Sequence, residues 1–270
     1  MYLPPKGLCC GRPLYDHGML DRAKLLLLEI LDVLQPEIEY EVPIVVLEPS
    51  CASVFRDELI NLFPRDERAQ KLSRQVFLLS EFLENRSVPL PKLARQALLH
   101  GHCHHKSIMK MTAEEAVLSR MGIDFRSPAP GCCGMAGAFG FERDKYDVSL
   151  AVGELELLPA VRAASPECLI IADGFSCREQ IAQCTDRHAL HLAEVIQMAM
   201  EEAPSSSAGE GPFDSRSGQV RATRVYPEHD RVLRRQMEVD RSMSRAGMGL
   251  AAMAAGALAL WALSRSKRST

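Results

Sequence analysis

The sequence predicts an α/β fold made of two repeated units, each with a short parallel sheet flanked by helices, followed by a flexible tail that carries a hydrophobic helix. With 270 residues, 47% of them apolar and 25% charged, the chain can bury a core. Short apolar runs rich in β-branched residues alternate with segments of helical periodicity, which is typical of parallel strands covered by helices. A Cys-Cys-Gly triplet also occurs twice, and a Ser-Cys pair follows each copy. We therefore expect one structural unit in two copies.

Each expected strand leads into a turn that carries a cysteine and then into a helix. The strands are expected at residues 44–47, 97–100 and 167–172, and the cysteines that follow them are Cys51, Cys103 and Cys177. Loops at the carboxyl ends of parallel strands converge and are the usual place for ligands. The amides and dipole at the start of the next helix favour a thiolate or another anion. A further helix is expected at residues 21–34, with an apolar repeat at Leu25, Leu28, Leu31 and Leu34.

The two triplets define the expected domain boundaries. Cys9-Cys10-Gly11 is followed after 39 residues by Cys51, and Cys132-Cys133-Gly134 is followed after 42 residues by Cys177. Only the second copy has a further strand and cysteine, ending in Cys103, ahead of its triplet. Residues 1–95 are therefore predicted to be a partial first unit, truncated at its N-terminus, and residues 96–202 a complete second unit.

The composition changes after residue 202. Residues 203–245 are rich in Pro, Ser, Gly and Arg and are expected to be a flexible linker. Residues 246–263 carry no charge and are flanked by basic residues, so they just reach the length of a membrane span. Because this segment consists mainly of alanine and glycine, a tail anchor and an amphiphilic or disordered tail are equally good interpretations.

Charge and cysteine usage exclude several classes of function. A net charge of -3 and a pI near 6.3 give no basic field for nucleic acid. Nine cysteines, an odd number, without a preceding secretory signal, disfavour a disulfide scaffold. Reduced thiols indicate the cytoplasm or an organelle matrix, with membrane association through residues 246–263 as an addition. The chain shows no Ser-His-Asp set and no Walker-type loop, so no catalytic residue is assigned.

Four cysteines of the second unit predict a metal centre, and we call them the second cysteine set: Cys103, Cys132, Cys133 and Cys177. Adjacent cysteines followed by a glycine can present two thiolates to one centre, and four thiolates satisfy a [4Fe-4S] cluster. Four thiolates also satisfy a structural zinc ion. Zinc usually takes closely spaced ligand pairs, which are absent here, so an iron-sulfur cluster is favoured and zinc is kept as the alternative.

Further candidate ligands are less complete. Cys9, Cys10 and Cys51, the first cysteine set, lack a fourth thiolate. His102 and His104 flank Cys103 and are candidate hydrogen-bond donors to sulfur, or a direct ligand. By contrast, the positions of Cys168 in a strand and Cys184 on a helix favour small buried side chains without a ligand role.

Four segments of the chain resemble a known family. They are residues 102–107, residues 131–140, residues 151–154 and residues 173–180, which include the second cysteine set. They are similar to the cysteine-rich CCG domains found in heterodisulfide reductases, in the iron-sulfur subunit of glycolate oxidase and in lactate-utilisation iron-sulfur proteins. The likeness covers about residues 7–200 and is closest to the C-terminal region of fused FAD-linked oxidase and Fe-S oxidoreductase proteins resembling D-2-hydroxyglutarate dehydrogenase.

The resemblance implies an electron-transfer function. It implies a cluster that passes electrons from a flavin, reduced by a 2-hydroxy acid of the D-2-hydroxyglutarate, lactate or glycolate type, to a quinone or another carrier. The chain departs from the family in lacking the closing Cys-x-x-Cys and any flavin-binding region, so FAD is expected only through a partner or a missing domain. The expectation is an Fe-S oxidoreductase component that needs a flavoprotein for catalysis. The alternative is a zinc-stabilised interaction scaffold without a redox role.

Overall fold

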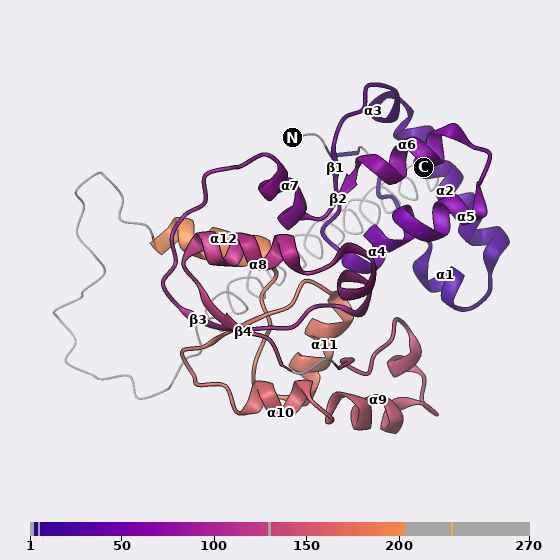
Figure 1. Cartoon of the computed structure of the whole chain (residues 1–270). Helices are drawn as coiled ribbons and strands as arrows, with labels where there is room; N and C mark the ends of the chain where they lie inside the picture. Colours follow the sequence, from indigo (N-terminus) through magenta and orange to yellow (C-terminus); the bar gives the residue numbers. More distant parts are fainter. Residues whose placement is uncertain (1–2, 5, 129–130, 203–227, 229–270) are drawn as a thin grey trace, which may run out of the picture. The chain divides into compact units, whose positions relative to one another are not determined.

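The computed structural model describes residues 3–4, 6–128, 131–202 and 228. They belong, apart from residue 228, to one compact unit, Met1–Arg224 (Figure 1). The predicted linker, except for residue 228, and the predicted hydrophobic segment 246–263 lie outside the described residues. In the part of the chain that is described, no helix has the length and apolar character of a membrane span.

The first half, residues 6–95, contains one small sheet and mostly helices. In chain order the elements are α1 (Arg12–Asp16), α2 (Leu20–Val33), α3 (Gln35–Glu39), β1 (Ile44–Val45), α4 (Pro49–Ser53), the π-helical turn η1 (Val54–Glu58), α5 (Leu59–Leu62), α6 (Glu67–Gln75), β2 (Val76–Phe77) and α7 (Leu79–Asn85). Strands β1 and β2 are parallel, with Ile44 opposite Val76. The expected strand at 44–47 is therefore confirmed in its first two residues only.

The second half, residues 96–202, carries a three-stranded parallel sheet of order β4-β3-β5. Its elements are β3 (Gln96–Leu99), the π-helical turn η2 (His105–Met109), α8 (Thr112–Met121), β4 (Asp124–Arg126), the 3-10 turn η3 (Phe139–Phe141), α9 (Tyr146–Gly153), α10 (Leu157–Arg162), β5 (Leu169–Ile171), α11 (Phe175–Cys184) and α12 (Leu192–Glu202). Leu190 adds a single parallel bridge to Ile171. The expected α/β class with short parallel sheets is confirmed.

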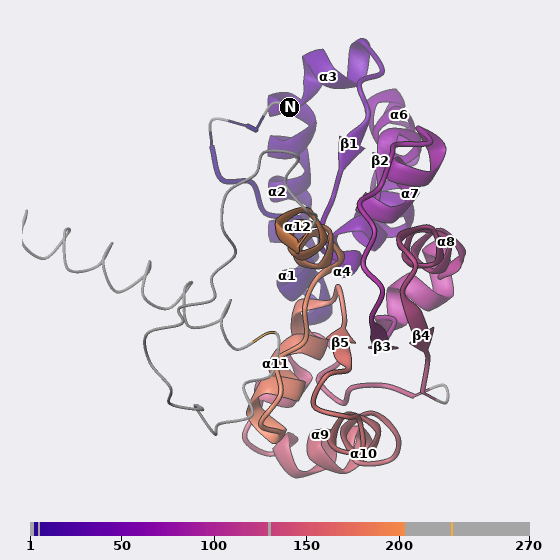
Figure 2. The same cartoon turned by 90° about the vertical axis from the view of Figure 1, so that its left-hand side faces the viewer.

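Helices cover both faces of this sheet. Successive side chains of a strand point to opposite faces. Ala97 and Leu99 accordingly pack in one core with residues of α8 and α12, whereas Leu98 packs in another with residues of α10 and α11. Figure 1 shows α8 and α12 above the strands and α10 and α11 below them, and Figure 2 shows the same separation. All three residues of β5 are fully buried, so the middle of the second half is fixed by packing on both sides.

Two local features occur in both halves. The glycine of each Cys-Cys-Gly triplet has a left-handed backbone, with φ 76° at Gly11 and 95° at Gly134. In each half, one helix that follows a strand residue is capped at its N-terminus by a glutamate. The glutamate accepts a hydrogen bond from the backbone N of the residue three positions before it. Leu78 N donates to Glu81 Oε2 at 2.8 Å, and His191 N donates to Glu194 Oε2 at 2.9 Å.

The glycine of the second triplet predicts a substitution effect. A Cβ at Gly134 would lie 2.0 Å from the Ser149 carbonyl oxygen, so Gly134→Ala combines left-handed strain with a backbone clash. We expect a loss of about 2–4 kcal/mol in unfolding free energy, measured by urea denaturation. Gly122→Ala is the matched control, because its φ is 83° but nothing lies within 4 Å of the added Cβ. It should cost only about 1–2 kcal/mol, and equal losses would show that the contact with Ser149 does not matter.

Candidate metal centre

Strand pairing brings the second cysteine set together. In β3 and β5, Leu99 lies opposite Ile171, so both strands end at the same edge of the sheet. Cys103 follows β3, and Cys177 lies in the first turn of α11 after β5. The loop after β4, the other neighbour of β3, supplies Cys132 and Cys133. The turns that carry Cys103 and Cys177 thus follow neighbouring strand ends, and the loop with Cys132 and Cys133 follows the third strand.

The four thiols are neighbours along a row that runs from the surface to the interior. Cys103 perturbs the pKa of Cys132, Cys132 that of Cys133, and Cys133 that of Cys177. Cys103 is exposed and Cys132 is half-buried, whereas Cys133 is 3% and Cys177 1% exposed. One end of the set is therefore accessible to a partner, and the other is shielded from water.

Alternation of donors and acceptors sets the charge of the thiols. The hydrogen bonds from Cys103 and Cys133, together with Gly134 N at 3.3 Å, lower the pKa of Cys132. A hydrogen bond from Cys133 likewise lowers the pKa of Cys177. The pKa values of Cys103 and Cys133 are raised, because each thiol shares its proton with a neighbouring sulfur. Lowered and raised thiol pKa values thus alternate along the set, and the two thiols with lowered pKa values lose their protons most readily to bind a soft metal.

The glycine-rich loop that begins at residue 131 is fixed by contacts with α9, with α11 and with the turn after Cys103. Gly134 lies against the Ser149 carbonyl, to which Gln180 Nε2 donates at 3.3 Å. Lys106 Nζ donates to the Gly131 carbonyl at 2.9 Å, which ties the start of this loop to the Cys103 turn. These contacts orient the Cys132 and Cys133 sulfurs towards the sheet edge.

The histidines divide between the two cysteine sets. His102 Nδ1 accepts from His104 N at 3.2 Å, and burial lowers the pKa of the His102 imidazole, while Cys177 and Cys132 act in the opposite direction. The His104 ring lies 5.2 Å from it, and its pKa is lowered by burial and then by Arg12 of the first half. His102 therefore belongs to the second set, and His104 lies towards the first.

Sequence reasoning missed His100. This residue directly follows β3, is 5% exposed and lies close enough to Cys177 to help lower the pKa of that thiol. Its backbone N donates to the Ile171 carbonyl at 2.8 Å, which fixes it between the two strand ends. The sequence contains a signal for this residue. His100 ends the apolar run expected at 97–100, directly before the turn with Cys103, so it lies at the same edge of the sheet as the cysteines.

The first cysteine set is partly assembled. The Cys10 and Cys51 sulfurs lie 2.9 Å apart, and this bond lowers the pKa of Cys10 to about 7 and raises that of Cys51. Cys9 is exposed. Arg12, which contacts Cys10 through its backbone, is held by Glu58 at 2.6 Å and by Ser53 at 2.8 Å. The first set therefore has a buried cation beside it.

The donor chemistry fits a thiolate-bound cluster. Four sulfurs at one sheet edge, a glycine backbone without side chains in the way and a dry inner end are the features that such a group requires. Within the described ranges, no three His, Cys, Asp or Glu side chains converge on a point where a single metal ion would sit. The ligand assignment stays a prediction.

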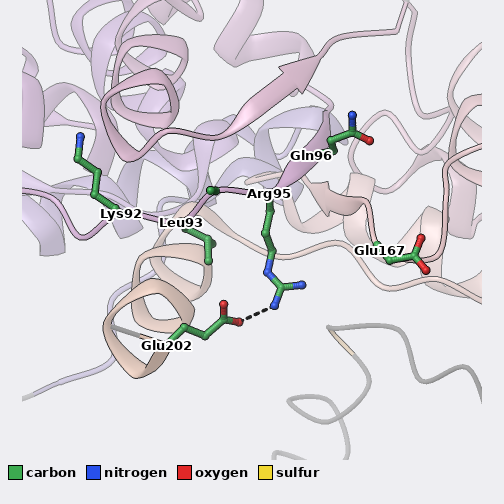
Figure 3. A pocket seen from close by; sticks show the side chains of 7 residues that line it. Lys92, Leu93, Arg95, Gln96, Glu167 and Glu202 are labelled. Atoms are coloured by element: carbon green, nitrogen blue, oxygen red, sulfur yellow. Dashed lines mark hydrogen bonds and ion pairs between the residues drawn. The ribbon is translucent and has the colours of Figure 1, made fainter. Parts of the chain in front are cut away.

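The remaining cysteines lie apart from both sets. Cys168 is buried in the core between the sheet and α10 and α11, and Cys184 is half-buried at the end of α11. A hollow of about 480 Å³ lies at the opposite, N-terminal end of β3 and has no cysteine in its lining (Figure 3). Arg95 Nη2 and Glu202 Oε1 bridge it at 2.9 Å.

The alternating charges predict the order of thiol labelling. In reduced, metal-free protein at neutral pH, Cys132 should react with iodoacetamide roughly tenfold faster than Cys103, although Cys103 is more exposed, because the thiolate is the nucleophile. Mass spectrometry of timed samples measures both rates. Cys184, whose pKa is raised by burial, is the slow internal control. Faster labelling of Cys103 would contradict this order of hydrogen bonds.

The chain is similar to several curated proteins, including the following three. The chain is 23% identical over 202 residues to a subunit of the anaerobic glycerol-3-phosphate dehydrogenase of Escherichia coli (strain K12), covering 72% of this chain and 50% of the relative. It is 28% identical over 189 residues to the D-2-hydroxyglutarate dehydrogenase of Pseudomonas putida (strain KT2440), covering 69% and 18%. It is 26% identical over 215 residues to lactate utilization protein A 2 of Bacillus cereus (strain AH820), covering 73% and 86%. The chain thus spans about half or less of the first two relatives.

A family model also matches the part of the chain that carries the second cysteine set. The model, CCG, is described as a cysteine-rich domain and matches residues 98–182. Those residues run from β3 through α11 and contain all four cysteines of the set. Residues 98–182 are therefore a CCG cysteine-rich domain, as the resemblance in the sequence predicted.

Proposed function

We propose that this chain is the iron-sulfur electron-transfer part of a flavin-linked dehydrogenase. The observation that carries the proposal is the convergence of four thiols within the CCG domain, at the sheet edge where β3 and β5 end. The names of the relatives point to dehydrogenation of small hydroxylated acids or of glycerol-3-phosphate. The substrate class we propose is a 2-hydroxy acid.

The second cysteine set would hold a [4Fe-4S] cluster. Such a group, when bound, supplies one-electron redox chemistry. The chain's own residues divide the remaining work. Cys133 and Cys177 lie at the buried inner end, the exposed Cys103 marks the face at which a partner approaches, and Gly134 N donates to the Cys132 sulfur. Hydrogen bonds to ligand sulfurs raise the reduction potential of a cluster.

We infer that the two halves are copies of one unit. The left-handed glycines of both triplets, the sulfur contacts Cys10–Cys51 and Cys133–Cys177 and the two glutamate-capped helices support this. The boundaries proposed from the sequence, 1–95 and 96–202, follow from this interpretation. The first cysteine set then lacks the thiol that Cys103 supplies in the second.

The partners follow from what the chain contains. We propose a flavoprotein subunit or domain that carries FAD and reduces the cluster, and a quinone or another carrier as acceptor. The proposed site of action is the cytoplasm or an organelle matrix, with residues 246–263 as a membrane contact. A zinc-stabilised scaffold is the second candidate, favoured by the same four thiols.

Metal and sulfide analysis decides between these functions. Protein purified anaerobically should contain about four irons and four acid-labile sulfides per site, with a paramagnetic resonance signal that changes on reduction by dithionite. Zinc without sulfide would replace the electron-transfer function by the scaffold.

Serine variants test the ligands. Cys132→Ser and Cys133→Ser should lose the metal and lower the thermal unfolding midpoint, because a bound metal contributes to folding free energy. Cys184→Ser is the matched control and should keep both. A variant of Cys133 with full metal content would show that the ligand assignment is wrong.

A further inference from the structure

Glu114 is a buried carboxyl group without a hydrogen-bond donor. It lies on α8, is 1% exposed, and neither of its oxygens has a donor among the described residues. The polar side chains that approach it are Ser80 of α7 and Asp173 after β5. An ionised carboxylate in such a place would be unsolvated and would face a second carboxylate.

Asp173 is arranged as an acceptor. It is 6% exposed, and its Oδ1 accepts from Leu192 N at 2.9 Å, with His191 Nε2 3.5 Å away. Two buried carboxyl groups in contact cannot both ionise at low cost, whereas a single proton between them gives one donor and one acceptor. A protonated Glu114 that donates to Asp173 also satisfies the oxygens that otherwise lack a partner.

We propose that Glu114 and Asp173 form an internal proton-binding site in which one proton is shared between the two carboxyl groups and locks the seam between residues 6–95 and 96–202. The inference rests on this packing and does not depend on the proposed function.

The pair lies where the two halves touch. Ser80 comes from the first half. His191, next to Asp173, donates from Nε2 to the Leu47 carbonyl of the first half at 2.8 Å, since its Nδ1 accepts from Ala193 N. Loss of the shared proton places two like charges at this seam. Asp173 is also four residues before Cys177. Weaker packing between the two halves would therefore also affect the turn that carries this candidate ligand.

Other charged groups face the pair and set the sign of the pH dependence. His191, before α12, and His105 of η2 interact with Asp173, and His105 in turn interacts with the ion pair of Arg56 of η1 and Glu81 of α7. Desolvation, followed by the charge of Asp173, raises the pKa of Glu114 well above its ordinary value. Its stabilising effect is therefore complete below the unfolded-state pKa of about 4.3 and is lost as pH rises through the folded-state pKa. Burial lowers the pKa of His105, so its effect has the opposite sign, with stability lost as pH falls below about 6.5.

The contribution of the bound proton to stability is measured by comparing the unaltered chain with a variant in which Glu114 is replaced by the neutral glutamine. Urea unfolding of the full chain, the Glu114→Gln variant and the Glu115→Gln variant is measured from about pH 5 to 9. Glu115 is the next residue on α8 and is less buried, which makes it the matched control. The unfolding equilibrium constant of the unaltered chain, divided by that of Glu114→Gln, should rise about tenfold per pH unit until Glu114 ionises. Glu115→Gln should follow the unaltered chain, and a flat ratio for Glu114→Gln overturns the proposal.

Infrared spectroscopy tests whether Glu114 and Asp173 share a proton in the folded, unaltered chain, so the result does not depend on how stable a variant is. In the folded, unaltered chain with isotopically labelled glutamate, the carbonyl stretch of an unionised carboxyl should persist at neutral pH. Asp173→Asn keeps an oxygen for Leu192 N and removes the facing charge, so this band should disappear at a lower pH than in the unaltered chain. Absence of the band at neutral pH, or the same titration in Asp173→Asn, overturns the shared proton.

Discussion

The parallel pairing of β3 with β5 is the constraint on which the site depends. Leu98 opposite Ile170 fixes the register, and the apolar side chains on both faces of the two strands leave no room for a slip, because a shift of one residue would exchange the two cores. The Cys103 and Cys177 turns inherit their positions from this register. The loop with Cys132 and Cys133 is then fitted against α9 and α11 through Ser149 and Gln180.

Much of the second half could be predicted because its strands are continuous apolar runs that end in cysteine. The strand expected at 167–172 is β5, which begins two residues later and ends one residue earlier, and the strand expected at 97–100 is β3 shifted by one residue. Edge strand β4 was missed, since Asp124 and Arg126 are polar and three residues are too few for a periodic signal. The π-helical turns after Cys51 and Cys103 also leave no mark in an apolar pattern.

The first half shows where periodicity misleads. The helix expected at 21–34 is α2, but Leu25 is 65% exposed, and the buried face is formed by Ala23, Leu27, Ile30 and Leu31. Four consecutive leucines, residues 25–28, fit several helical faces equally well, so the sequence alone does not select one. For the site, spacing named the four converging cysteines, whereas His100 and Arg12 depended on tertiary contacts that no local pattern contains.

Burial gives the two ends of the second cysteine set different roles. Cys177 is almost fully buried at the start of α11, where helix amides favour negative charge, and the nearby His100 helps to lower the pKa of its thiol. Cys103 is exposed, and its pKa is raised mainly by Cys132 and by burial, with Lys106 acting in the opposite direction. Negative charge added to a group held by these thiols is therefore stabilised most at the inner end. The accessible end is where a partner approaches with the least desolvation of the protein.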